Sequence, residues 1–150
     1  MTIPRKALRL EYRDASELAD NPANWRRHPP AQQHALQAML KEVGWAGALL
    51  YNERTGRLVD GHLRKKVSKG KVPVLVGDWT EEEERKILAT LDPLSAMAQP
   101  DQDKLLELLA SVQFQDASVT AMLEALANGE TQPMPPLYDD PGAQIERADE

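Results

Sequence analysis

The start of the chain alternates between apolar and polar positions. Leu8, Leu10 and Tyr12 are separated by single polar residues, so residues 7–13 predict a strand with one buried face. The segment at 21–30 holds three prolines and two asparagines, which oppose regular structure. We therefore expect a half-buried strand that leads into an irregular loop.

An amphipathic helix and a hairpin come next. Apolar residues recur every three or four positions over 32–43, and Gly44 provides a natural stop, so a helix is expected there. Short apolar runs at 48–51 and 57–60 flank a polar turn, which predicts two antiparallel strands. A short helix over 62–69 should follow the second of these strands.

The middle of the chain predicts one more strand and one more helix. The near-continuous apolar run at 72–78 suits a buried strand, with Pro73 near its start or at a sheet edge. Thr80 and Glu83 have the spacing of a capping box, which predicts that a helix begins there. This helix should end at about residue 91, because Pro93 prevents its simple continuation.

The second half of the chain is rich in leucine and acid. Amphipathic patterns over 103–112 and 118–127 predict a helical hairpin that packs on the domain or on a partner. Residues 130–150 contain four prolines and few core formers, so we expect a flexible linker or tail. The four glutamates at 81–84 are expected to form a solvated first helical turn that matches the helix dipole.

Charge divides the chain into a basic and an acidic part. Residues 1–79 carry 14 Lys and Arg against 8 Asp and Glu, whereas residues 80–150 carry 4 against 16. A basic part can attract phosphates, although two differently solvated surfaces would give the same composition. We expect DNA binding by this chain alone to be weak, because the acidic part opposes it.

The composition excludes several classes of function. No cysteine is present, so disulfides, thiol catalysis and thiolate metal sites are excluded. No apolar run approaches the roughly 20 residues that a membrane helix needs. The N-terminal sequence lacks the apolar core of a signal peptide. We expect a cytoplasmic protein with no membrane partner.

The segment RLVDGHLRKK, residues 57–66, carries the clearest candidate chemistry. A strand that turns at Gly61 into a helix exposes backbone N–H groups, and the helix dipole adds partial positive charge there. The Arg64 guanidinium can bind phosphate oxygens, while His62 and Lys65 can add donors or charge. The segment therefore predicts an anion site for phosphate, with a tight turn bearing surface cations as the alternative.

Other polar and aromatic residues near this turn have alternative roles. Asp60 and His62 are candidate catalytic residues or metal ligands, but no third ligand is identifiable, so no metal site is predicted. His28 is a candidate phosphate contact or a surface residue, and His34 is expected to be structural. Trp25 is expected either to stack on a base or to fill the core.

The order of elements resembles the N-terminal domain of ParB, in the ParB/sulfiredoxin superfamily. The resemblance covers roughly residues 7–92 and depends on NPANWR at 21–26, VDGHLR at 59–64 and VPVLV at 72–76, followed by Asp78. It implies an α+β fold with a small mixed sheet and packed helices. It also implies a pocket for a nucleotide, with ATP or CTP and Mg²⁺ as possible ligands. The residues that would bind the nucleotide and its phosphates are Arg26, Arg27, Gly61, His62, Arg64 and Lys65.

Departures from the motifs of this superfamily narrow the chemistry. Sulfiredoxin needs a cysteine in a GCHR turn, where this chain has His62, so sulfiredoxin activity is excluded. Free serine kinases carry a DGHHR-like turn, in which Leu63 here replaces the second histidine. ParB proteins carry GERR, of which Arg64 matches, and an ENxQR-like segment whose polar pattern is missing at 89–93. These departures argue against magnesium-dependent CTP hydrolysis, although Asp60 could approach a metal.

The truncated pattern resembles the ParB-like domain of phages and mobile elements, which often forms the N-terminal part of a DNA methyltransferase. On this basis we expect a ParB-like nucleotide-binding domain at 1–100, a helical extension at 101–129 and the linker or tail at 130–150. No methyltransferase motif is present, so methyl transfer is not expected within these 150 residues.

Three functions are compatible with these patterns. The first is a nucleotide-binding module that acts in DNA-associated processes as part of a larger, phage-type DNA-modifying protein. The second is an enzyme, either a ParB-like nuclease or a nucleotide-dependent phosphotransferase that uses Asp60 or His62, and the lack of a carboxylate cluster counts against it. The third is a partner-binding module that forms a homodimer through the helices at 103–128, without nucleotide.

Overall fold

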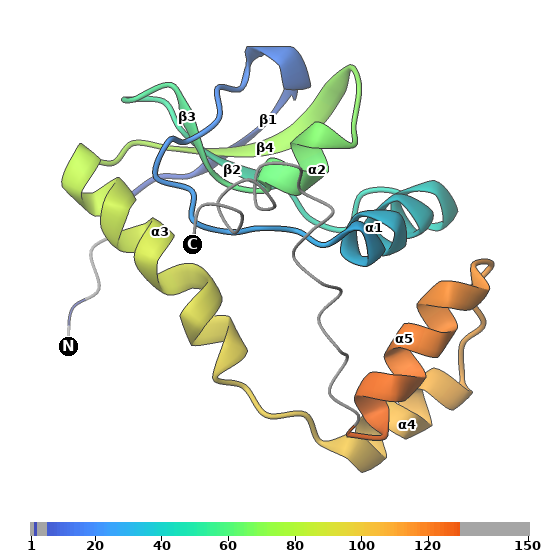
Figure 1. Cartoon of the computed structure of the whole chain (residues 1–150). Coiled ribbons are helices and arrows are strands. Elements are labelled where there is room, and N and C mark those ends of the chain that lie inside the picture. The colour runs from blue at the N-terminus through green and yellow to red at the C-terminus, as the bar shows by residue number, and fades with distance from the viewer. Residues whose placement is uncertain (1, 3–5, 130–150) are drawn as a thin grey trace, which may run out of the picture. The chain divides into compact units, whose positions relative to one another are not determined.

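The computed structural model describes residue 2 and residues 6–129, which form two compact units (Figure 1). Of the described residues, the first unit comprises 2, 6–26 and 45–98, and the second comprises 27–44 and 99–129. The elements of the first unit are β1 (Arg9–Asp14), η1 (Ala15–Glu17), β2 (Leu49–Asn52), β3 (Arg57–Asp60), α2 (His62–Lys66), β4 (Lys71–Gly77) and α3 (Glu81–Ala96). Those of the second unit are α1 (Pro30–Glu42), α4 (Gln102–Ala110) and α5 (Ala117–Ala127).

The first unit is built on a four-stranded mixed sheet with the order β1-β4-β2-β3. β4 pairs antiparallel with β1 and parallel with β2, and β2 pairs antiparallel with β3. The predicted α+β fold with a small mixed sheet, packed helices and a C-terminal helical hairpin is therefore confirmed. β4 is an interior strand, so Pro73 lies near its start but not at an edge of the sheet.

The core lies on one face of this sheet. Alternate residues of β4 point into it, as expected for side chains that repeat every second position along a strand. Leu18 and Trp45, from outside the strands, also pack against this core. The buried members of the cluster are Ala15, Leu18, Leu49, Tyr51, Leu58, Val72, Val74 and Val76.

β1 presents its apolar residues to the opposite face, and here the sequence-based prediction is wrong. Leu10 is 59% exposed and Tyr12 is 66% exposed, whereas a buried face was expected. The core face of the sheet instead carries Arg9, Glu11 and Arg13. The Glu11 carboxylate forms ion pairs with both arginines. The Arg13 guanidinium also lies 4.9 Å from the centre of the Tyr51 ring. Periodicity predicted the strand correctly but could not show which face the core would cover.

α3 begins at the predicted capping box. The side chain of Thr80 accepts a hydrogen bond from the backbone N–H of Glu83, and the Glu83 carboxylate accepts one from the N–H of Thr80. The helix does not end before Pro93 but continues through it to Ala96, which corrects the predicted end. Pro93 is exposed and lies in the last turn of the helix. It cannot donate a backbone hydrogen bond, but only three helical residues follow it, so the loss disturbs little of the helix.

The second unit contains the helical hairpin together with α1. α4 packs against α5, and α1 also contacts α5. His34 on α1 pairs with Asp116 at 2.7 Å, and the backbone N–H of Gln115 donates to the Glu42 carboxylate at 3.0 Å. The predicted division at residues 100 and 129 stays a prediction, but α1 groups with the hairpin and not with the sheet. The predicted linker or tail at 130–150 lies outside the described residues.

Among the described residues, the structure contains no helix with the length and apolar character that crossing a membrane requires.

Candidate functional site: the glycine turn and its arginines

The turn between β3 and α2 requires a glycine at position 61. Gly61 has a φ of 94°, in the left-handed region that other residues rarely adopt. A Cβ atom there would lie 2.2 Å from Cδ2 of Leu49, so a side chain would also collide with the core. No side chain caps the start of α2. The first hydrogen bond of the helix runs from the backbone N–H of Lys65 to the Gly61 carbonyl. The first N–H groups of this helix thus have no side-chain acceptor.

Asp60 joins two arginines beside this turn. Its carboxylate accepts from Nη1 of Arg26 at 2.7 Å and lies 3.5 Å from Nη2 of Arg64. Arg26 also pairs with Asp92 through Nε at 3.1 Å and donates to the Val59 carbonyl at 3.2 Å. The Arg26 guanidinium is therefore held on several sides, whereas Arg64 has one long contact and retains donors for a further anion.

The NPAN loop, residues 21–24, is attached directly to the turn. The backbone N–H of Asn21 donates to Nε2 of His62 at 3.1 Å, and the Asn21 side chain accepts from the N–H of Ala23 at 3.0 Å. Because Nε2 accepts this bond, its lone pair is not free to act as a base, and Nδ1 has no partner. Burial lowers the pKa of His62, since an apolar environment disfavours the imidazolium.

Four of the predicted binding residues come together here, namely Arg26, Gly61, His62 and Arg64. Lys65 lies on the same short helix, but its ammonium pairs with Asp20 at 2.8 Å. Arg27 belongs to the second compact unit and makes no ion pair with any described residue. His28 lies in the second unit as well, where its ring contacts Gln32 at 3.0 Å.

Two further acidic residues escaped the sequence-based prediction. Asp92 pairs with Arg26, and a signal was available, because an acidic residue near the C-terminal end of a helix opposes the helix dipole unless it has a partner. Glu84 was expected to be solvated, but it is buried and this expectation is wrong. Leu88, four positions later, is also buried and lies on the same face of the helix as Glu84. This spacing is a signal that the Glu84 side chain points toward the interior.

Glu84 is the centre of a buried polar network. Its carboxylate accepts from Asn52 at 3.1 Å and from Thr55 at 2.5 Å, and it pairs with Arg57 at 3.0 Å. Asn52 also exchanges two hydrogen bonds with the backbone of Trp79, both at 3.0 Å. The network attaches the start of α3 to the β2–β3 hairpin.

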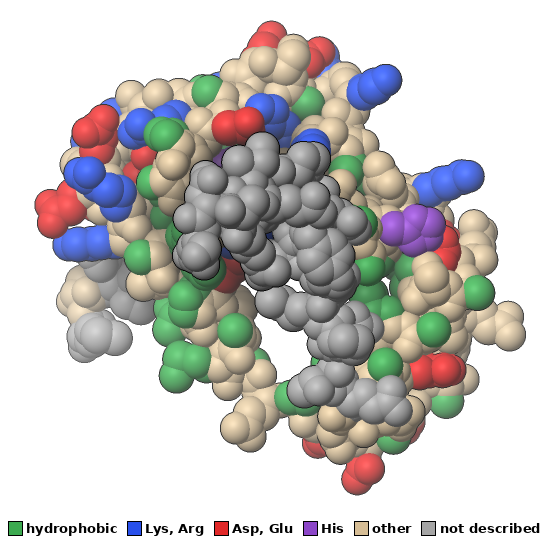
Figure 2. Space-filling view, in the orientation of Figure 1, with side chains coloured by type: hydrophobic (Ala, Val, Ile, Leu, Met, Phe, Trp, Pro, Cys, Tyr) green, Lys and Arg blue, Asp and Glu red, His purple; other side chains and the backbone are tan. Residues whose placement is uncertain are grey.

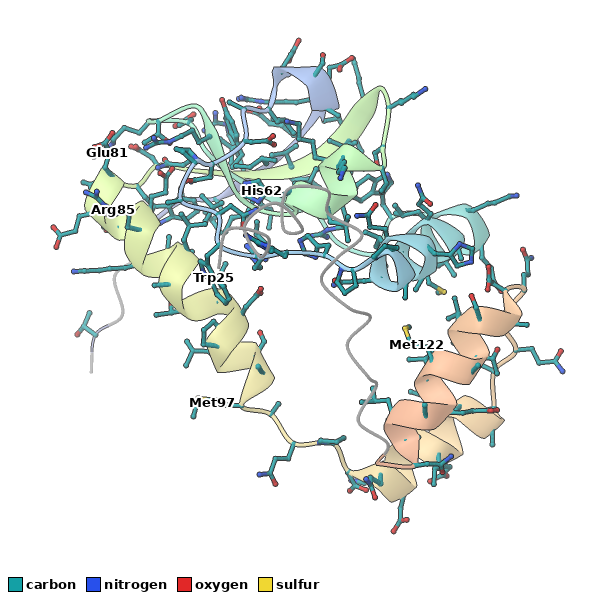
Figure 3. The ribbon with its side chains drawn as sticks, in the orientation of Figure 1. Trp25, His62, Glu81, Arg85, Met97 and Met122 are labelled. Atoms are coloured by element: carbon teal, nitrogen blue, oxygen red, sulfur yellow. The ribbon has the colours of Figure 1, made fainter. Side chains whose placement is uncertain are left out.

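A small cavity lies beside this network. It has a volume of about 170 Å³ and is lined by residues of the NPAN loop, β3 and the first turns of α3. Figure 3 shows Glu81 and Arg85 on these turns and Trp25 beside a later part of α3. The indole N–H of Trp25 donates to the Leu88 carbonyl at 2.8 Å. Trp25 is 54% exposed, so it lies against the helix and does not fill the core.

The described residues contain no group of three or more His, Asp or Glu side chains that could hold a metal ion. Around the sheet, basic and acidic side chains are interspersed on the face that Figure 2 shows.

Comparison with solved structures places the fold among ParB proteins. The truncated chromosome-partitioning protein ParB from Caulobacter crescentus, complexed with CTP-γ-S, is similar over 65% of this chain with 18% identity and a TM-score of 0.53. A Pnob8-like ParB-N domain is similar over 85% of this chain, also with 18% identity, with a TM-score of 0.51. The chain covers 59% and 52% of these two proteins. Neither a family model nor a curated protein sequence matches the chain. The chain therefore has a ParB-like fold.

Proposed function

We propose that the sheet unit is a nucleotide-binding module of the ParB-like type, which binds nucleotide phosphates at the Gly61 turn. The observation that carries the proposal is the position of Arg64. Its guanidinium lies beside a helix start without a side-chain cap and has one long contact, to Asp60 at 3.5 Å. Backbone N–H groups without acceptors, next to a guanidinium that can donate two parallel hydrogen bonds, can bind phosphate oxygens.

Arg26 supports this site through Asp60 and does not itself meet the ligand. It is only 13% exposed, and its donors are used by Asp60, Asp92 and the Val59 carbonyl. Its role in the proposal is to hold Asp60, and through it the turn, so that Arg64 is the arginine that meets the ligand. His62 holds the NPAN loop against the same turn through its bond to Asn21.

CTP is the first ligand to test, because one structural neighbour is a complex with a CTP analogue. ATP is the second candidate. A Mg²⁺ ion would have to be bound largely by the nucleotide, with Asp60 as the carboxylate in the turn, because three protein ligands are not available among the described residues. Asp60 or His62 as catalytic residues of a nuclease or phosphotransferase is the less supported alternative, since the lone pair of His62 Nε2 is already used.

Calorimetric titration with CTP, ATP and GTP, with and without Mg²⁺, tests the proposal. Arg64→Ala should weaken binding by roughly tenfold or more, since hydrogen bonds to charged groups contribute about 1.5–3 kcal/mol. Lys66→Ala is the matched control, because it removes the same charge from the exposed side of the same helix. The proposal is wrong if the folded chain binds no nucleotide, or if both variants weaken binding equally.

We extend the proposal to a DNA-associated process in which this chain is the N-terminal module of a larger, phage-type DNA-modifying protein. Its support is the ParB-like fold together with the resemblance of the sequence pattern to the ParB-like domains of phages and mobile elements. The sequence that follows residue 150 in the gene tests it. A DNA methyltransferase domain there is the expected result, and a stop codon contradicts it.

The helical hairpin supports a second candidate function, which is association with a partner or with another copy. Its exposed apolar side chains are Leu106, Leu108, Val112 and Leu126. Gel filtration of a chain that ends near residue 100, compared with the full chain, tests this function. The loss of a dimer on truncation would support it.

A further inference from the structure

The outer edge of the sheet is unpaired in the described part of the chain. β1 is the terminal strand in the order β1-β4-β2-β3, and it pairs with β4 alone. No strand or bridge formed by residues 6–129 lies on its other side. A strand edge carries free N–H and C=O groups, which pair readily with another strand. This edge is therefore able to accept one.

The same strand exposes a continuous apolar stripe. Leu10 and Tyr12 are 59% and 66% exposed and lie on the same face of β1, and Leu8, which directly precedes the strand, is 50% exposed. The stripe continues into the sheet, where Leu75 faces Leu10 and Pro73 faces Tyr12. Contiguous exposed apolar side chains of this kind mark an interaction surface.

The sequence of β1 determines which partner fits this edge. When Leu10 faces its own copy in an antiparallel pair, Leu8 faces Tyr12 and Arg9 faces Glu11. Apolar pairs then occupy one face, and two pairs of opposite charge occupy the other. Directly opposed side chains of these kinds stabilise strand pairs.

Neighbouring registers are unfavourable. A centre at Glu11 places this carboxylate opposite itself and Arg9 opposite Arg13, so like charges meet. A centre at Arg9 places this guanidinium opposite itself. A centre at Tyr12 pairs Glu11 with Arg13 but places both copies of Leu10 opposite Asp14. The charges and the apolar stripe therefore select the register centred on Leu10.

We propose that two copies of this chain join through β1, antiparallel about a two-fold axis at Leu10, and form one continuous eight-stranded sheet from two four-stranded sheets. Such an interface is self-complementary, as a two-fold dimer requires. Within one chain, Nε of Arg9 already lies 2.6 Å from the Glu11 carboxylate, so both charges can share partners across the axis without being left unpaired. The dimer does not depend on nucleotide.

Disulfide trapping tests the register directly. The chain has no cysteine, so Leu10→Cys introduces a single thiol that faces its own copy. Directly opposed residues of antiparallel strands have Cα atoms roughly 4.5–5.5 Å apart, within the range that a disulfide spans. Under mild oxidation, a covalent dimer should form quickly. Tyr12→Cys is the matched control on the same face, and it should form one at least tenfold more slowly, because its thiol faces Leu8 of the second copy.

Sedimentation without nucleotide, over a range of protein concentrations, tests the association itself. Leu10→Lys should raise the dimer dissociation constant at least tenfold, because two ammonium groups meet on the axis. Leu108→Lys tests the competing interface through the helical hairpin, where this leucine is also 59% exposed, and it should leave the β1 dimer unchanged. Circular dichroism verifies that both variants are folded. A monomeric parent chain, equal trapping at positions 10 and 12, or a dimer lost only in Leu108→Lys would each overturn the proposal.

Discussion

The backbone N–H of Asn21 donates to Nε2 of His62 at 3.1 Å, and this bond joins the NPAN loop to the first residue of α2. The two residues are 41 positions apart, and the sequence predicts His62 to be a phosphate contact or a catalytic group. In the structure, Nε2 of His62 accepts a bond from this loop. The ring must be neutral at Nε2 to do so, which makes this contact sensitive to pH.

We predict that His62 makes the free energy of unfolding depend on pH below about 6.5, the ordinary pKa of histidine. Burial lowers the pKa of His62 in the folded chain, so the unfolded chain binds the proton first as the pH falls. The stabilisation is complete above that pH and decreases below it. Urea denaturation at about pH 7.5 and 5.5 should show a smaller decrease for His62→Gln, whose amide oxygen accepts the same bond without titrating. An equal decrease in both chains would contradict this prediction.

Arg26→Ala should destabilise the first unit by about 2–4 kcal/mol, because it leaves two partly buried carboxylates without their common partner. These are Asp60 at 2.7 Å and Asp92 at 3.1 Å. Arg54→Ala is the control, since its ion pair with Asp78 is exposed and should contribute under about 1 kcal/mol. Urea unfolding of both variants measures the difference. Equal losses would mean that Arg26 does not hold the turn.

Gly61→Ala should cost more stability than Gly44→Ala. The two glycines have nearly the same φ, 94° and 93°, so the left-handed conformation costs a similar roughly 1 kcal/mol at each. A Cβ at Gly61 would lie 2.2 Å from the Leu49 side chain, whereas nothing lies within 4 Å at Gly44. We expect an additional 1–3 kcal/mol or so at Gly61, from crowding of the core. Thermal unfolding with matched losses would show that the turn can move aside.

Glu84→Ala should destabilise the chain by about 3–5 kcal/mol, because it leaves Arg57 and Asn52 without their buried partner. Glu82→Ala, in the same helical turn but exposed, should change the free energy of unfolding by less than about 0.5 kcal/mol. Chemical denaturation separates the two outcomes. Similar small losses would place Glu84 in solvent, as the sequence had suggested.

The sequence predicted those features that depend on local patterns. The capping box at Thr80, the hairpin strands and the glycine at position 61 each follow from residue types at fixed spacing, and all are present. The ParB-like fold followed from the order of three short segments. Local patterns therefore located the turn before its partners were known.

The features that were missed depend on tertiary packing. The apolar face of β1 is exposed because the core lies on the other face, a choice that alternation alone does not make. Glu84 is buried because Asn52, Thr55 and Arg57 of the β2–β3 hairpin converge on its carboxylate. The positions of these three residues in the sequence do not indicate that they meet Glu84. The Asp92 partner of Arg26 is 66 positions away, so only the folded chain reveals the pair.

An NMR titration with CTP is the sharpest test of phosphate binding at the Gly61 turn, because it locates the ligand as well as detecting it. Amide resonances of Gly61, His62, Leu63 and Arg64 should shift in a saturable manner, and the shifts should be lost in Arg64→Ala while Lys66→Ala retains them. Saturable shifts confined to other residues, or no shifts with any nucleotide on a folded chain, would contradict a phosphate site at this turn.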